Sequence, residues 1–351
     1  MAVELQQLVD RAAGKSRGAG VIAALQSGDG GLDLAAADAS SAMTTTTPYF
    51  LASITKMYTA TVVMSLAEND TIDLDAPISA YVDPGLIHGI HVLDDVDYTD
   101  EITGTRLLAQ TSGLADYFEG APKGGVSLVD DLKQGRDRSL DIEDIVEIVR
   151  GLRPEFPPGA DDGTKAQYSD TNYALLGAMI ESVTGATVAA NFEERIFSRL
   201  GLTQTFVFDH TRDQPTPTPF YFKDRVLDIP LAMSSFAPDG GVVSTVSDSL
   251  RFLRAFFGAE LLSEAGLASM TSHWNNIFFP LQYGSGVMRF QLPRWMTPFK
   301  AAPELIGHSG STGSFAFYQR KRDVYLAGSV NQMDNPNRPY RLMTRMINLL
   351  D

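Results

Sequence analysis

Ser53 and Lys56 stand three residues apart, and their types and spacing suit covalent catalysis better than any other pair in this chain. The apolar pattern from Tyr58 to Ala67, followed by polar turn formers at 68–70, predicts a helix that begins at Ser53. Ser53 would then lie near the free N–H groups of the helix N-terminus, with Lys56 on the same face. A serine hydroxyl becomes a nucleophile when a neighbouring base takes its proton, so the pair predicts an acylating serine. The alternative is an N-capping serine beside a solvated lysine, because so short a motif also occurs by chance.

Tyr168 and Asp170 form a second pair of candidate residues, downstream of the turn former Pro157-Pro158-Gly159 and at the start of an apolar helical pattern. Two other Tyr-x-Asp triplets, at 81–83 and 98–100, lie in acidic loop sequence, where solvated turns are expected. A tyrosine fixed beside Lys56 would have a lowered pKa and could act as a base. We therefore single out Tyr168.

The glycine-rich segment from Gly307 to Gly313 is the third candidate, and it leads into a strand-like stretch at 315–319. Its glycines would let the backbone approach a substrate, and His308 and Ser309 supply hydrogen-bond donors. For His308 taken alone, a structural histidine is the alternative.

Composition restricts the partners of this chain of 351 residues, whose formal net charge is −15. Nucleic acid and anionic membranes require a basic surface, so neither is expected as a partner. The chain has no cysteine, which excludes disulfides and thiol nucleophiles. No apolar run approaches the length of a membrane span, and Met1 to Lys15 lacks the pattern of a signal peptide, so we expect a cytoplasmic protein. The sequence leaves the oligomeric state open.

The elements that must position these residues are predicted from periodicity and turn formers. Helices are expected at 1–15, 102–114 (short), 141–150, 168–180, 188–200, 246–257 and 338–350, and strands at 20–25, 31–37, 315–319 and 324–331. Residues 121–139 are predicted to be an exposed loop, and the aromatic-rich stretch 274–299 has no predicted element. Strands at both chain ends predict a mixed α/β sheet domain from 1–75 and 225–351, around a mostly helical domain from 76–224.

The three motifs, in this order, resemble the serine β-lactamase-like superfamily of penicillin-recognising hydrolases. Within it, the chain is similar to the branch of class C β-lactamases, D-Ala-D-Ala carboxypeptidases and related family VIII-type esterases. Further stretches carry the likeness over most of the chain: 111–117, 157–159, 168–177 and 240–245. The resemblance implies an α/β (α+β) fold of the β-lactamase/transpeptidase type, with an antiparallel sheet flanked by helices and built from both chain ends. It also implies that the active site lies in the cleft between the sheet domain and the helical domain.

The resemblance also implies roles for individual residues. Ser53 would be acylated, Lys56 and Tyr168 would share the proton transfer, and the N–H groups of Ser53 and Ser311 would form the oxyanion hole. The residues expected to contact substrate are Asp170, His308, Ser309, Gly310 and Tyr117. Class C β-lactamases carry Asn in place of Asp170 and Lys in place of His308, so the charge of the site differs from theirs.

The expected function is a serine hydrolase, and for a cytoplasmic protein a carboxylesterase for small acyl esters is favoured. A β-lactamase, a D-Ala-D-Ala carboxypeptidase or D-aminopeptidase, and an acyltransferase remain alternatives, as does a catalytically weak binding or sensor protein. The substrate would be a small ester or amide, and several aromatic residues could line its acyl pocket or belong to the core instead: Tyr117, Phe118, Tyr221, Trp274 and Trp295.

Two other enzyme classes fit less well. An α/β-hydrolase needs a histidine after its nucleophile, and no histidine follows His308. His88 and His91 lack the helix motif and third ligand of a metal hydrolase, so no metal and no cofactor are expected.

Overall fold

The computed structural model describes residues 1–14, 20–296 and 302–350. Its centre is an eight-stranded antiparallel sheet in the order β10-β11-β12-β13-β14-β15-β1-β2. Strands from the two ends of the chain pair near the β2 edge of this sheet, where Ile22 of β1 lies opposite Ser329 of β15. The strands of this sheet are β1 (Ile22–Ser27), β2 (Asp33–Ala37), β10 (Asn275–Phe278), β11 (Leu281–Tyr283), β12 (Met288–Phe290), β13 (Leu305–Ser309), β14 (Ser314–Gln319) and β15 (Val324–Ser329).

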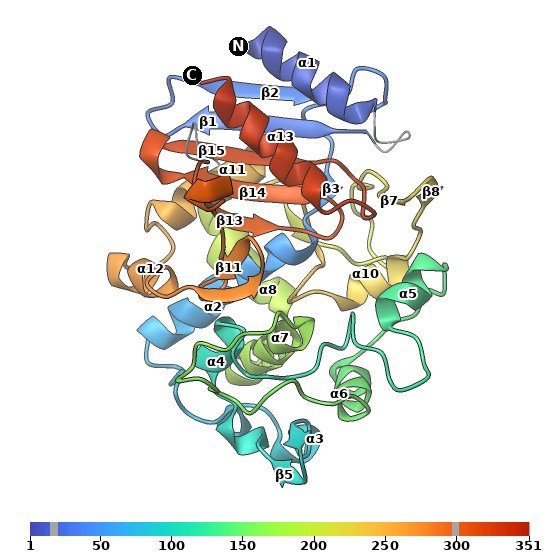
Figure 1. Ribbon diagram of the computed structural model, residues 1–351, viewed down its shortest axis with the longest axis vertical. Coiled ribbons are helices and arrows are strands. Elements are labelled where there is room, and N and C mark those ends of the chain that lie inside the picture. The colour runs from blue at the N-terminus through green and yellow to red at the C-terminus, as the bar shows by residue number, and fades with distance from the viewer. Residues whose placement is uncertain (15–19, 297–301, 351) are drawn as a thin grey trace.

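Helices cover both faces of the sheet. The terminal helices α1 (Ala2–Ala13) and α13 (Asn337–Asn348) lie together on one face, with both chain ends at the top of Figure 1. Their apolar residues recur at helical spacing, as Leu342, Met343, Met346 and Ile347 do in α13, and are buried. On the other face, α11 (Val246–Phe257) packs against β1, β14 and β15.

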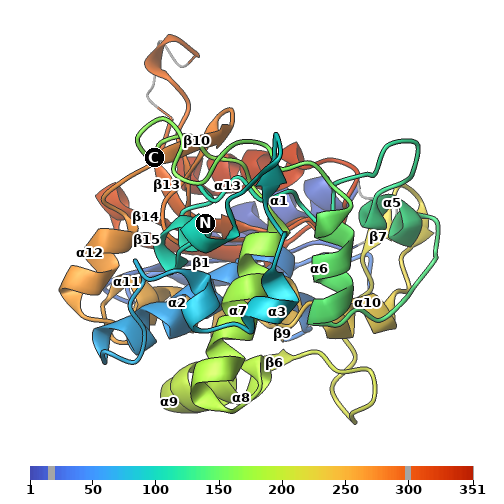
Figure 2. The ribbon, with the colours of Figure 1, turned by 90° about the horizontal axis from the view of Figure 1, so that it is seen from below.

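The lower half of Figure 1 is mostly helical, and α7 (Asp170–Thr184) is its central element. This helix contacts α2 (Thr55–Glu68), α4 (Gly104–Leu108), α6 (Ile142–Arg150) and α8 (Val188–Phe192), and Figure 2 shows it among them from below. A separate small antiparallel sheet has the order β3-β9-β6; its strands are β3 (Tyr49–Phe50), β9 (Val242–Ser244) and β6 (Phe206–Val207).

Short elements complete the chain. They are η1 (Ala52–Ile54), η2 (Ile78–Ala80), α3 (Pro84–Ile87), β4 (Val92–Leu93), β5 (Val96–Asp97), η3 (Thr99–Glu101), α5 (Leu128–Lys133), η4 (Glu193–Phe197), α9 (Ser198–Leu200), β7 (Tyr221–Phe222), β8 (Arg225–Val226), α10 (Pro230–Ser235), α12 (Glu264–Met270), η5 (Arg294–Met296) and η6 (Arg320–Arg322).

The predicted fold class, an antiparallel sheet built from both chain ends and flanked by helices, is confirmed. One local prediction is wrong, and one stretch without a predicted element is ordered. The expected loop 121–139 contains α5, which Ser127 caps and which buries Leu128, Val129 and Leu132. The aromatic-rich stretch forms β10, β11 and β12, whose shortness and bulge after Asn276 hide the strand period; its residues 297–299 lie outside the described residues.

The division into two domains stays a prediction. Its proposed limit between residues 224 and 225 falls inside the β7–β8 hairpin, and β6 from the predicted helical part pairs with β9.

In the described ranges no single helix is long and apolar enough to cross a bilayer. Only α7 and the following helical segment 188–200, taken together, have the length and apolar composition of a span, and they are bent by 79° relative to each other.

Candidate active site

Ser53 lies in the tight turn η1, which runs directly into α2. The turn follows β3, whose residues Tyr49 and Phe50 pair with Ser244 and Val243 of β9. Ala52, just before Ser53, has a φ of 47°, a left-handed conformation that a non-glycine residue adopts only under constraint. The predicted helix start is therefore preceded by a sharp bend that presents Ser53.

The turn between β13 and β14 holds this bend in place. Thr312 donates a hydrogen bond from Oγ1 to the Phe50 carbonyl at 3.1 Å, and Ser314 donates from Oγ to the Leu51 carbonyl at 2.6 Å. Gly310 allows the close approach, because a Cβ there would lie 2.3 Å from the Leu51 carbonyl oxygen. The third sequence motif thus packs against the backbone that carries Ser53, and Ser311 lines the same pocket.

Lys56 is fully buried next to Ser53. Its Nζ donates to Ser53 Oγ at 3.2 Å and to the Asp239 carbonyl at 2.9 Å, and it forms an ion pair with Asp170 Oδ1. Burial lowers the pKa of Lys56, but Asp170 and, more weakly, Tyr168 and Asp239 outweigh burial and raise it above its ordinary value. The resting site therefore contains an ammonium group at this position.

Asp170 is the first residue of α7, and its neighbours fix its position. Its N–H donates to Asp116 Oδ1 at 3.1 Å, while the N–H of Ser169 donates to Gln110 Oε1 at 2.9 Å. Burial and the Asp170 carboxylate raise the pKa of Asp116 well above its usual range. The negative charge on this side of the site is thus concentrated where Asp170 meets Lys56.

Tyr168 lies beside both Ser53 and Lys56, with its ring centroid 5.3 Å from Lys56 Nζ. Its hydroxyl is buried and has no hydrogen bond of standard geometry within the described part of the chain, although Ser53 and Lys56 are near enough to lower its pKa. Burial outweighs them, and with Asp170 it raises the pKa of Tyr168 above the ordinary value. Lys56 lowers the pKa of Tyr168, as expected, but the net shift is upward. Tyr168 is therefore a neutral phenol.

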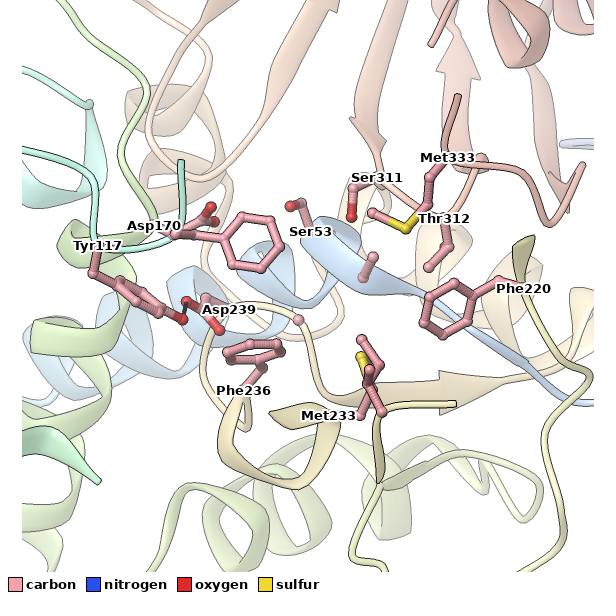
Figure 3. A pocket seen from close by; sticks show the side chains of 14 residues that line it. Ser53, Tyr117, Asp170, Phe220, Met233, Phe236, Asp239, Ser311, Thr312 and Met333 are labelled. Atoms are coloured by element: carbon pink, nitrogen blue, oxygen red, sulfur yellow. Dashed lines mark hydrogen bonds between the residues drawn. The ribbon is translucent and has the colours of Figure 1, made fainter. Parts of the chain in front are cut away.

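The pocket in front of Ser53 combines a charged side with an apolar side (Figure 3). Asp170 and Asp239 lie on one side of Ser53, and Ser311 and Thr312 lie on the other. The apolar lining consists of Phe118, Phe220, Ile229, Met233, Phe236 and Met333. The free space is small, about 40 Å³. None of the described residues that line it is Lys, Arg or His.

His308 and Ser309, which the sequence analysis expects to contact substrate, do not line this pocket. The His308 ring is fully buried, 3.3 Å from the Tyr283 hydroxyl, and burial, with Lys56, lowers its pKa to about 3. Ser309 points to the opposite face of the sheet, where its Oγ lies 2.7 Å from the Tyr340 hydroxyl of α13. Gly310 has a steric role in packing.

The aromatic residues proposed for the pocket divide in the same way. Tyr117 and Phe118 line it, whereas Tyr221, Trp274 and Trp295 do not. Trp295 is 76% exposed.

A family model described as Beta-lactamase matches residues 5–347. The chain belongs to this family. The resemblance inferred from the three motifs is thereby confirmed.

Proteins of several activities are similar to this chain. Penicillin-binding protein 4 of Amycolatopsis lactamdurans is 28% identical over 250 residues, which cover 65% of this chain and 58% of that protein. Alignments with the first curated relatives span only 58%, 34% and 50% of their lengths. Among solved structures, a D-stereospecific amidohydrolase from Streptomyces sp. matches with a TM-score of 0.77 and 27% identity, covering 97% of this chain and 98% of that chain. The D-amino acid amidase from Ochrobactrum anthropi SV3 shares the fold, with a TM-score of 0.81, 22% identity and 100% and 99% coverage.

Asp239 is a site residue that the sequence analysis missed in this member of the beta-lactamase family. It is buried, lines the pocket, and accepts a hydrogen bond at Oδ2 from the Tyr117 hydroxyl at 2.7 Å. Burial raises the pKa of Asp239 to about 7; Lys56 opposes this shift and Asp170 adds to it. The only signal in the sequence is its place before Gly240-Gly241, in a turn that the fold brings to Lys56.

We predict that Asp239 makes stability fall with rising pH. A carboxyl group whose pKa is higher in the folded chain than in the unfolded chain binds more protons when folded, so the free energy of unfolding declines between the two pKa values, here about 3.8 and about 7. Relative to wild type, Asp239→Asn should therefore gain on the order of 1 kcal/mol or more in stability as the pH rises from about 5 to 8. Urea unfolding across this range measures the difference.

Tyr117→Phe is the matched control for this measurement. The Tyr117 hydrogen bond lowers the pKa of Asp239, so its removal should extend the loss of stability to higher pH. The prediction would be contradicted if the free energy of unfolding differed between Asp239→Asn and wild type by the same amount at every pH.

Proposed function

We propose that this chain is a serine hydrolase that cleaves small carboxylic esters through an acyl-enzyme on Ser53. The observation that carries the proposal is the position of the Ser53 hydroxyl: it lies beside the Lys56 ammonium and opens into a small, largely apolar pocket with no cationic lining in the described residues. Such a site supplies a nucleophile, a proton route and room for a short acyl group.

The proposed proton route begins with Tyr168. The Lys56 ammonium already donates to Ser53 Oγ, so it cannot take the serine proton first. As Ser53 attacks the ester carbonyl, its proton moves to the Tyr168 oxygen while the Tyr168 proton moves to the alkoxy oxygen of the ester in the same concerted relay; no doubly protonated phenol forms, and the alcohol then departs neutral. Lys56 keeps its charge and stabilises the negative charge that develops on the reacting atoms.

The N–H groups of Ser53 and Ser311 are proposed to receive the carbonyl oxygen. Ser53 lies at the start of a helical segment, where N–H groups have no partner within the helix. Ser311 lies across the pocket in the turn that packs on η1 (Figure 3). Donors fixed in this way stabilise the oxyanion of the tetrahedral intermediate. A second tetrahedral intermediate forms when water attacks the acyl-enzyme, and the same donors would stabilise its oxyanion.

The electrostatics of the pocket favour substrates without a carboxylate near the scissile bond. Asp170 lines the pocket as the partner of Lys56, and Asp239 adds a second carboxyl group. A carboxylate-bearing substrate, such as a β-lactam or a D-Ala-D-Ala peptide, would face these groups without a cationic side chain in the lining to bind it.

A second candidate function is hydrolysis of small amino acid amides. The same two carboxyl groups, Asp170 and Asp239, could bind an ammonium group on the acyl part of the substrate. The D-stereospecific amidohydrolase from Streptomyces sp. is similar to this chain over nearly its whole length, which supports this candidate.

We predict that Tyr168→Phe lowers kcat for ester hydrolysis by on the order of 10²-fold or more, because the ring remains but the proton carrier is lost. Tyr283→Phe is the matched control: this buried tyrosine contacts the Tyr168 ring, but its hydroxyl pairs with Tyr173 and His308. The control should stay within a few-fold of wild type. A loss below about tenfold in Tyr168→Phe would assign the proton transfer to Lys56 or water.

The acylated residue is identified by a matched pair of serine variants. Ser53→Ala should abolish turnover and also labelling by a fluorophosphonate probe, detected by mass spectrometry of the intact protein. Ser309→Ala should keep both, because the Ser309 hydroxyl lies on the far side of the sheet. Equal labelling of Ser53→Ala and wild type would refute the assignment, and an unreactive Ser53 in the wild type would favour a binding protein.

Substrate charge is tested with methyl esters of similar length, followed by titration of the released acid. Methyl butyrate and the cationic β-alanine methyl ester should be cleaved, and monomethyl succinate should be at least about tenfold slower, a difference of about 1.4 kcal/mol. Nitrocefin should be slow for the same reason. Efficient cleavage of monomethyl succinate or nitrocefin would contradict the assignment, and faster release of ammonia from D-alaninamide than of acid from the esters would make amide hydrolysis the function.

A further inference from the structure

A second, larger cavity lies next to the pocket of Ser53. Its free space is about 540 Å³, against about 40 Å³ in front of Ser53. Both spaces are lined by the same three side chains, Phe220, Ile229 and Met233, each at most 5% exposed. We call these three residues the dividing wall. No other described residue lines both spaces.

We infer that the dividing wall determines the length of acyl group that the enzyme accepts, and that the cavity behind it is a site for the alkyl chain of longer acyl groups once the wall is opened. The inference rests on the proposed function of Ser53. It assigns a specificity role to three residues that belong to none of the three motifs.

The part of the cavity nearest the wall is apolar and suits an alkyl chain. Phe50 and Phe208 line it, with ring centroids 5.1 Å apart, and Phe50 lies 5.6 Å from the Phe220 ring of the wall. Leu227 adds a buried aliphatic side chain. Three charged residues also line the cavity: Asp209 and Arg212 form an ion pair with each other, and Asp228 is exposed to solvent. An alkyl chain that passed the wall would therefore enter an aromatic environment before reaching polar groups.

Met233 is the part of the wall that can be removed with least disturbance. It lies in α10, and its backbone N–H donates to the Ile229 carbonyl, a bond that alanine would keep. Its thioether side chain is unbranched and adaptable, whereas the Phe220 ring packs on Phe50. Met233→Ala would remove the atoms beyond Cβ from both linings at once.

Met333 provides a matched control. It is a methionine that lines the space in front of Ser53 but not the larger cavity. Met333→Ala removes the same side-chain atoms as Met233→Ala and also enlarges the pocket in front of Ser53, but it does not connect this pocket to the larger cavity.

The test compares kcat/KM for p-nitrophenyl acetate, butyrate and octanoate in the wild type and both variants. The wild type should lose at least tenfold between butyrate and octanoate. Met233→Ala should raise the octanoate-to-acetate ratio at least tenfold, and Met333→Ala should change it less than threefold. Thermal unfolding checks that each variant is folded, and Ile229→Ala, which opens the same wall, replaces Met233→Ala if that variant does not fold.

Three results would overturn the inference. The wild type could cleave the octanoate ester as fast as the butyrate ester. The octanoate-to-acetate ratio of kcat/KM could stay unchanged in a folded wall variant, or it could change equally in Met333→Ala. Short and long p-nitrophenyl alkylphosphonates separate these outcomes from failure of the proposed function. If neither labels Ser53 in any protein, the proposed function fails. If the short one labels Ser53 in all three proteins and the long one is not accelerated in Met233→Ala, only the dividing wall is refuted.

Discussion

The buried ion pair between Lys56 and Asp170 is the interaction on which the arrangement of the site depends. Lys56 belongs to α2 and Asp170 begins α7, so the pair joins the segment that carries Ser53 to the central helix of the lower half. Removing one partner of such a pair leaves an unpaired buried charge, which costs about 3–5 kcal/mol. Ser53 Oγ and the Asp239 carbonyl accept hydrogen bonds from the same ammonium group, so both are placed by it as well.

The carboxylate at position 170 affects both chemistry and recognition. It raises the pKa of Lys56 and keeps this group charged, which is why the proposed proton route begins with Tyr168. It also places a carboxyl group, with that of Asp239, on the side of the pocket opposite Ser311 and Thr312. An asparagine at position 170, as in class C β-lactamases, would remove both effects. In the proposed function, one side chain therefore links the proton route to the charge of acceptable substrates.

The sequence contained enough information for the parts of the structure that depend on local pattern. The helix α6 was predictable because its apolar period and its Asp141 capping box are both visible, and the order of the motifs predicted that Ser53, Lys56 and Tyr168 meet. The role of Asp239 was not predictable, because it depends on a turn that brings it to Lys56 across 183 positions. The orientations of His308 and Ser309 depend on which face of β13 packs against α13, and residue order alone does not show this.

The fold constrains the position of Ser53 more strongly than it constrains the apolar side chains that line the pocket. The close packing of the β13–β14 turn on η1 positions Ser53, because Gly310 and Ser314 contact the Leu51 carbonyl just before it. The apolar lining is under no such constraint: Met233 and Phe220 contact space on both sides, and a change of their volume alters the pocket without altering the nucleophile. Amidohydrolases and penicillin-binding proteins can therefore share this fold and differ in substrate. The inferred role of the dividing wall would make side chains outside the three motifs the ones that decide specificity in this scaffold.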